Sequence, residues 1–133
     1  FIKKGITAEM SDKAIALAVG MGFNVKLFFI IGFPIETMKD VQKSFNLALK
    51  YSIADIRFFN LFPYPDTVLM KWLKENRVHF FYQIDEYTND YKRFQRIPIF
   101  EYQGGMNYQA KLKALNLADE VVRTVEKRRK GHI

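Results

Sequence analysis

Two short proline-containing segments have the residue types and spacing to hold a flat heterocyclic ligand. They are residues 32–37 (GFPIET) and 62–67 (FPYPDT), and each follows an apolar run. Proline fixes φ and so stiffens each turn, and each segment ends near a residue able to cap a helix. Rigid backbone placed in this way can hydrogen-bond to the edge of a heterocycle while apolar side chains cover its face. The two segments are therefore the candidate ligand site.

The absence of cysteine removes several kinds of chemistry from this chain. It excludes disulfides, thiolate-bound zinc, a cysteine nucleophile and a cysteine-ligated iron–sulfur cluster on these 133 residues. Imidazole is available only from His79 and His132. A dedicated transition-metal site is therefore not expected, and we assign no metal ligand and no catalytic residue.

One run of residues supplies much of the net charge of +7, because residues 127–130 (KRRK) contribute four positive charges. A cationic run at the C-terminal end of a helix suits the helix dipole, and a solvated helix end is the simplest interpretation. The alternative function is a non-enzymatic α/β interaction module that binds nucleic acid or an acidic partner through this basic C-terminal helix.

Helices and strands alternate along the first part of the chain. We expect a helix over residues 8–21, a strand over 25–31 covered on both faces, a helix from Thr37 to about Tyr51, and a strand over 55–62. Thr37 followed by Asp40 is a loose capping box, and Asp66 is expected to cap a third, short helix. The apolar residues that recur on the faces of the first two helices are Met10, Ala14, Leu17, Met21, Val41, Phe45, Ala48 and Leu49.

Residues 76–105 lose this rhythm. Their aromatic side chains follow no clean period, so we expect a long irregular connection packed through its aromatics, with one short strand around 78–84. A final helix is expected from Tyr108 to Lys130, and its apolar face carries Ala114, Leu117, Ala118, Val121 and Val125.

Alternation of strands and helices at this spacing indicates parallel crossover units, as found in a barrel or a doubly wound sheet. In such folds the ligand binds at the carboxyl ends of the strands. Residues 32–37 and 62–67 occupy those positions. Asn60 lies just before the second segment, and a buried amide there must find a partner or face a cavity.

Three stretches, in order and in spacing, resemble the radical S-adenosylmethionine enzymes. LFFIIGFPIET (27–37) is similar to the family's fifth-strand segment, which has a G-x-I-x-G-x-x-E or GFPGET pattern. NLFPYPDT (60–67) is similar to the TPYPGT-like end of the sixth strand, and FIKKGITA (1–8) looks like the stretch that follows the fourth. The resemblance covers roughly residues 1–75.

The resemblance implies an α/β fold: a fragment of a partial (β/α) TIM-like barrel with parallel strands and a C-terminal helical extension. Residues 1–75 would form the C-terminal half of the barrel, and residues 76–133 the aromatic connection and the long helix. The whole enzyme would use a 4Fe-4S cluster to cleave S-adenosylmethionine reductively to a 5′-deoxyadenosyl radical. The cluster's cysteines would lie upstream, so this chain would supply adenosyl-contacting strand ends and barrel wall, and would be inactive alone.

Within the family, the pattern looks most like the branch with a cobalamin-binding domain, which includes magnesium-protoporphyrin IX monomethyl ester oxidative cyclase. Methylthiotransferases are the neighbouring alternative. Cobalamin is therefore a further cofactor that the resemblance suggests, and the substrate would be a small molecule or a tetrapyrrole-like compound. The residues that the resemblance assigns to cofactor binding are Ile30, Gly32, Phe33, Pro34, Asn60, Phe62, Pro63 and Tyr64.

The sequence departs from the family pattern at three positions. Ile35 and Asp66 each stand where the family has glycine, and Phe28 takes the place of the first glycine of the longer motif. If positions 35 and 66 need a positive φ, the β-branched Ile35 would be strained, whereas Asp66 would tolerate it better. Phe28 would fill space close to the adenine.

The chain opens without an initiator methionine or a signal-peptide pattern, so we expect an excised piece whose main partner is the rest of its own polypeptide. Removing the first strands of a barrel would expose an apolar strand edge through which the fragment self-associates. No apolar run approaches the roughly 20 residues that a membrane span needs. We expect a cytoplasmic protein without a membrane span.

Overall fold

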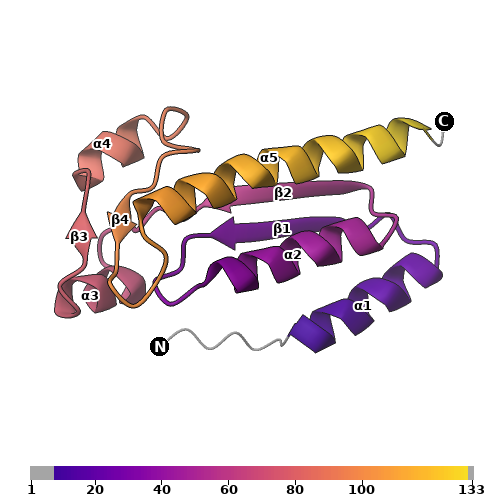
Figure 1. Cartoon of the computed structure of the whole chain (residues 1–133), viewed down its shortest axis with the longest axis horizontal. Coiled ribbons are helices and arrows are strands. Elements are labelled where there is room, and N and C mark those ends of the chain that lie inside the picture. Colours follow the sequence, from indigo (N-terminus) through magenta and orange to yellow (C-terminus); the bar gives the residue numbers. More distant parts are fainter. Residues whose placement is uncertain (1–7, 132–133) are drawn as a thin grey trace.

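The computed structural model describes residues 8–131, and a parallel strand–helix–strand unit lies at its centre (Figure 1). The strands β1 (Lys26–Ile31) and β2 (Asp55–Asn60) are joined by helix α2 (Met38–Lys50). They pair in parallel, from Lys26 opposite Asp55 to Ile31 opposite Asn60. The predicted parallel α/β arrangement is confirmed. The described residues form two separate two-stranded sheets, of which this is the parallel one, and not a closed barrel.

Two helices cover one face of this sheet. Helix α2 and the long C-terminal helix α5 (Tyr108–Gly131) lie against it, with α1 (Ala8–Gly20) beyond α2 (Figure 1). Phe58 of β2 is central to the packing, since its ring lies 5.6 Å from that of Phe29 and 5.2 Å from that of Phe45. The buried members of this core are Ile15, Ile31, Val41, Phe45, Ala48, Ile53, Ile56, Phe58, Met106, Ala114, Leu115, Ala118, Val121 and Val125.

The opposite face of the sheet is open. Alternation along the strands puts Phe28, Ile30 and Phe59 on this face, and they are 63%, 45% and 51% exposed. The expectation that β1 is covered on both faces is therefore wrong for residues 8–131. The apolar run of β1 indicates that both faces of the strand are apolar. It does not indicate which face is covered by residues 8–131.

The first helix is also oriented differently from the prediction. Leu17 and Met21 are 66% and 65% exposed, whereas Ile15 is buried and Val19 packs against the core. In α5 the predicted apolar face is largely confirmed, although Leu115 is fully buried while Leu117 is only half-buried.

The segment between β2 and α5 is more ordered than predicted. Helix α3 (Val68–Glu75) is followed by β3 (His79–Phe80), α4 (Ile84–Asn89) and β4 (Phe100–Glu101), and β3 pairs antiparallel with β4. Helix α4 was not expected from the sequence. Its signal was Gln83 followed three residues later by Glu86, whose carboxylate accepts the Gln83 amide at 2.7 Å. A second core lies here, made of Leu61, Leu73, Tyr87, Phe94, Ile99 and Phe100.

The cap of α3 also differs from the prediction. Thr67 and not Asp66 is the N-cap, because its hydroxyl accepts from the Met70 amide at 3.1 Å. Asp66 instead has a φ of 62°, in the left-handed region. The predicted start of α2 is confirmed, since Thr37 and Asp40 form a complete capping box.

Candidate functional site

The loop after β1 is closed by its own glutamate. Gly32 has a φ of +117°, which favours glycine, and its amide donates to Glu36 Oε1 at 2.9 Å. The Glu36 amide in turn donates to the Phe33 carbonyl at 3.0 Å. Glu36 is only 9% exposed and lies just before Thr37, the N-cap of α2. The Gly32 amide is thus engaged within the loop and is not free to bind a ligand.

The loop after β2 has a related design. Asp66 supplies the left-handed residue that the turn requires, at the position where the family pattern has glycine. Ile35, the other non-glycine departure, has no positive φ, so the strain considered there is absent. Thr67 then closes the turn, since its hydroxyl donates to the Tyr64 carbonyl at 2.8 Å.

The two loops lie side by side at the carboxyl ends of the strands. The Leu61 amide donates to the Ile31 carbonyl at 2.9 Å, which extends the pairing past the last strand residues. A Cβ added to Gly32 would lie 3.5 Å from Leu61 Cβ and 3.9 Å from Asn60 Oδ1. Residues predicted from two separate segments are therefore neighbours.

A cavity of about 580 Å³ borders the end of β2 and contains half of the predicted site residues. Ile30, Asn60, Phe62 and Tyr64 line it, whereas Gly32, Phe33, Pro34 and Pro63 do not. Phe28, which was expected to fill space near a ligand, stacks on Phe59 at 6.2 Å and does not line the cavity. Arg57, for which the sequence allows either an exposed or paired position or one facing substrate in a full barrel, also lines the cavity. The lining residues not expected from the sequence are Phe58, Phe59, Leu61, Tyr91, Gln95 and Arg96.

Asn60 hydrogen-bonds to the connection (residues 76–105) beside this cavity. Its Nδ2 donates to the carbonyls of Phe94 and Ile97, at 2.9 and 2.7 Å. The partner expected for a partly buried amide is therefore backbone more than thirty residues further along the chain. Asn60 holds the wall formed by residues 91–96 against the end of β2.

The two arginines of the cavity differ in how well they are bound. Arg96 makes a two-pronged ion pair with Asp119, with Nε and Nη2 2.6–3.0 Å from its carboxylate oxygens, and Nη1 donates to the Gln95 carbonyl. Arg57 makes one contact, from Nε to Asp55 Oδ2 at 3.3 Å. Its two Nη atoms have no hydrogen-bond partner among residues 8–131.

The connection also packs against both loops. The Tyr87 hydroxyl donates to the Pro63 carbonyl, and burial raises the pKa of Tyr87 to about 12. Gly105 approaches Pro34 so closely that an added Cβ would be 1.8 Å from the Pro34 carbonyl oxygen. These contacts bring the connection against both strand-end turns.

Lys111 of α5 is a buried cation that lies close to the connection. It is 4% exposed, its Nζ donates to the Phe100 carbonyl at 2.8 Å, and it lies 3.6 Å from the centre of the Phe100 ring. Burial lowers the pKa of Lys111 to about 8, although the charges of Glu36 and Glu101 partly oppose this shift. Lys111 therefore ties α5 to β4 through the Phe100 carbonyl.

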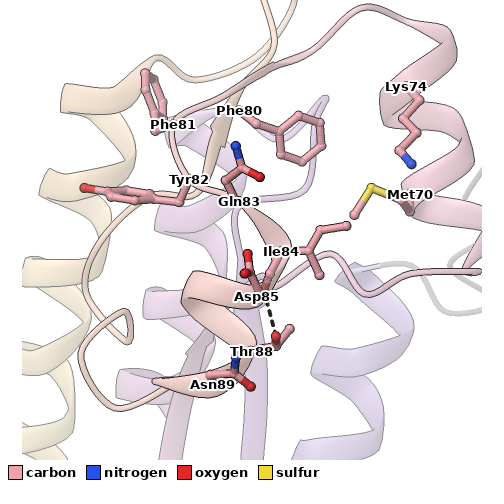
Figure 2. Close-up of a pocket in the computed structure, with 10 residues that line it drawn as sticks. All are labelled: Met70, Lys74, Phe80, Phe81, Tyr82, Gln83, Ile84, Asp85, Thr88 and Asn89. Carbon is pink, nitrogen blue, oxygen red and sulfur yellow. Dashed lines mark hydrogen bonds between the residues drawn. The ribbon is translucent and has the colours of Figure 1, made fainter.

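A second cavity, of about 610 Å³, lies between α3, β3 and α4 (Figure 2). Figure 2 shows Met70, Phe80 and Ile84 directed toward the same hollow. Lys74, Asp85 and Asn89 also border it. None of the predicted site residues lines this cavity.

The basic run at the end of α5 is partly bound to the chain itself. Arg128 Nη1 donates to the Leu49 carbonyl at 2.6 Å, and Arg129 Nη1 donates to the Ala54 carbonyl at 3.3 Å. Binding of nucleic acid or an acidic partner through this run stays a prediction.

Across residues 8–131, no cluster of three or more acidic, histidine or cysteine side chains is arranged to hold a metal ion. In the same range, no helix is both long and apolar enough to cross a membrane.

Comparison with known proteins gives one partial similarity. An uncharacterized methyltransferase of Pyrococcus horikoshii is 37% identical to this chain over 78 residues, which are 59% of the chain and 17% of that protein. The chain thus matches a small part of a much longer relative. No family model matches the chain, and no solved structure matches it.

Proposed function

We propose that this chain forms one wall of the S-adenosylmethionine site in a longer enzyme, with its strand-end loops beside the adenosyl group. One observation carries the proposal. Two turns, each with one residue in the left-handed region (Gly32 and Asp66), lie together at the carboxyl ends of neighbouring parallel strands. Ligands of parallel α/β folds bind at this position.

The cavity beside these turns suits a purine. Phe62 and Tyr64 offer aromatic faces, Ile30 an apolar one, and the amide of Gln95 can hydrogen-bond to a heteroatom. Such sites combine a mostly apolar lining with a few polar groups. The chain's own part is to bind and orient the adenosyl group and to exclude water from it.

S-adenosylmethionine is a sulfonium, whose carbon–sulfur bonds are activated for methyl transfer or for reductive cleavage. The similarity to a methyltransferase supports use of this molecule, and the GFPIET and FPYPDT motifs favour the radical S-adenosylmethionine family within that chemistry. A 4Fe-4S cluster does not fit this chain, which has no cysteine. Its ligands, and any cobalamin, would belong to the rest of the proposed polypeptide.

We further propose that the open face of the sheet is the inner face of a partial barrel completed by that polypeptide. Parallel sheets are normally covered on both faces, and Phe28, Ile30 and Phe59 form an exposed apolar surface of the kind that marks an interface.

Binding of S-adenosylmethionine to the full-length polypeptide, measured by isothermal titration calorimetry, tests the proposal. Gly32→Val puts a β-branched residue at a φ of +117° beside Leu61 and should weaken binding at least about tenfold. Gly20→Ala is the matched control, because an added Cβ there meets nothing within 4 Å. Equal affinity of the wild-type protein and Gly32→Val would remove these loops from the site.

A further inference from the structure

We propose that the substrate of this enzyme carries an anionic group, a carboxylate or a phosphate, that binds Arg57. The inference rests on the proposed function, which turns the open face of the sheet toward a barrel interior.

Arg57 lies in the middle of the open face. It pairs with Phe28 across the two strands and precedes Phe59 by two residues, so all three side chains project from the same side. The rings of Phe28 and Phe59 stack at 6.2 Å with an interplanar angle of 27°. A cation beside a pair of aromatic faces suits a molecule with a planar apolar part and a negative group.

The guanidinium of Arg57 has unused donors. Arginine carries five N–H groups in a rigid fork, and within the described residues only Nε is engaged, by Asp55 at 3.3 Å. Its side chain is 57% exposed, so in this chain water can satisfy the two Nη groups. Arg96 in the same cavity is instead held by Asp119 on two sides, which leaves Arg57 as the arginine there that is ready for a ligand.

Covering the open face of the sheet would remove the water that hydrogen-bonds to the two Nη groups of Arg57. An arginine moved out of water with two unpaired Nη groups loses its hydration and gains nothing in return, which is strongly unfavourable. A carboxylate or phosphate would replace the lost hydrogen bonds to water, because it can accept two parallel hydrogen bonds from the guanidinium. Arg57 on a face that becomes a barrel interior therefore predicts an anion opposite it.

The experiment uses the full-length polypeptide and three probes: benzoate, phenyl phosphate and the neutral benzamide. Affinity is measured by ligand-observed NMR with S-adenosylmethionine present. We expect at least one anion to bind about tenfold more tightly than benzamide. Arg57→Gln should abolish that difference and Arg57→Lys should keep part of it, because lysine retains the charge but loses the fork. The ratio of benzoate to phenyl phosphate affinity separates a carboxylate from a phosphate substrate.

Arg93→Gln is the matched control, since Arg93 is exposed, contacts the Phe94 ring and does not line the cavity. Unchanged anion affinity in Arg57→Gln would overturn the inference and indicate that a protein carboxylate occupies the fork. Weaker S-adenosylmethionine binding in Arg57→Gln, with anion binding intact, would overturn it in favour of the cofactor's own carboxylate. Failure of the wild-type protein to bind S-adenosylmethionine would instead overturn the proposed function, whatever the probes show.

Discussion

The carboxylate of Glu36 accepts a hydrogen bond from the backbone amide of Gly32, 2.9 Å away, across the turn that follows β1. The bond fixes a glycine with a φ of +117° at the end of the strand. It also satisfies an amide that would otherwise be buried without a partner. Glu36 therefore shapes the loop, and its role is to position backbone.

Replacing Glu36 tests this role. Glu36→Ala should lower the free energy of unfolding by about 1–3 kcal/mol, because the Gly32 amide loses its acceptor in a buried setting. Glu36→Gln keeps an acceptor oxygen and should cost less. Urea denaturation followed by circular dichroism measures both. Equal losses for the two variants would show that the charge of Glu36, and not its hydrogen bond, matters.

The close approach of Gly105 to Pro34 gives a second prediction. Gly105→Ala would place a methyl group 1.8 Å from a backbone oxygen, so one of the two segments must move. We expect a loss of about 3 kcal/mol or more, as for other steric errors at buried backbone. Gly20→Ala, at a helical position with free space, should be neutral or slightly stabilising. Similar melting temperatures for the two variants would contradict this packing.

Lys111 predicts a pH dependence. Its pKa is lowered from 10.5 to about 8, so between these values the unfolded chain holds a proton that the folded protein has released. Stability should therefore rise with pH through this window, by about 3 kcal/mol in all. The relevant measurement is the free energy of unfolding between pH 7 and 10, for both the wild-type protein and Lys111→Met. The other lysines and the tyrosines contribute equally in the two proteins, so their titration cancels in the comparison. Above pH 8 the free energy of unfolding of the wild-type protein should rise relative to that of Lys111→Met. Parallel pH profiles of the two proteins would show that Lys111 titrates normally.

The sequence predicts the central unit well because its signals are local. The apolar run before Gly32, the Thr37–Asp40 cap and the periodicity of α5 each specify an element without reference to the rest of the chain. Asp66 and Thr67 show the limit of such signals. Both residue types cap helices, and the left-handed turn at Asp66 decides between them.

The site is predictable only where it adjoins the strand ends. Asn60, Phe62 and Tyr64 adjoin the strand ends, where ligands of parallel α/β folds bind, whereas Ile30 was assigned by the family resemblance alone. All four line one cavity. Tyr91 comes from a connection without a period, and it reaches the cavity because backbone carbonyls at 94 and 97 bind Asn60. Contacts of that kind depend on tertiary packing, which no local pattern encodes.

The most direct test of the proposed function is to identify the product that the full-length polypeptide forms from S-adenosylmethionine. The protein is prepared anaerobically, reconstituted with iron and sulfide, and incubated with S-adenosylmethionine and dithionite, and the products are separated by liquid chromatography and mass spectrometry. We expect cluster-dependent formation of 5′-deoxyadenosine, reduced in Gly32→Val and unchanged in Gly20→Ala. A protein that binds no cluster and leaves S-adenosylmethionine intact would contradict it.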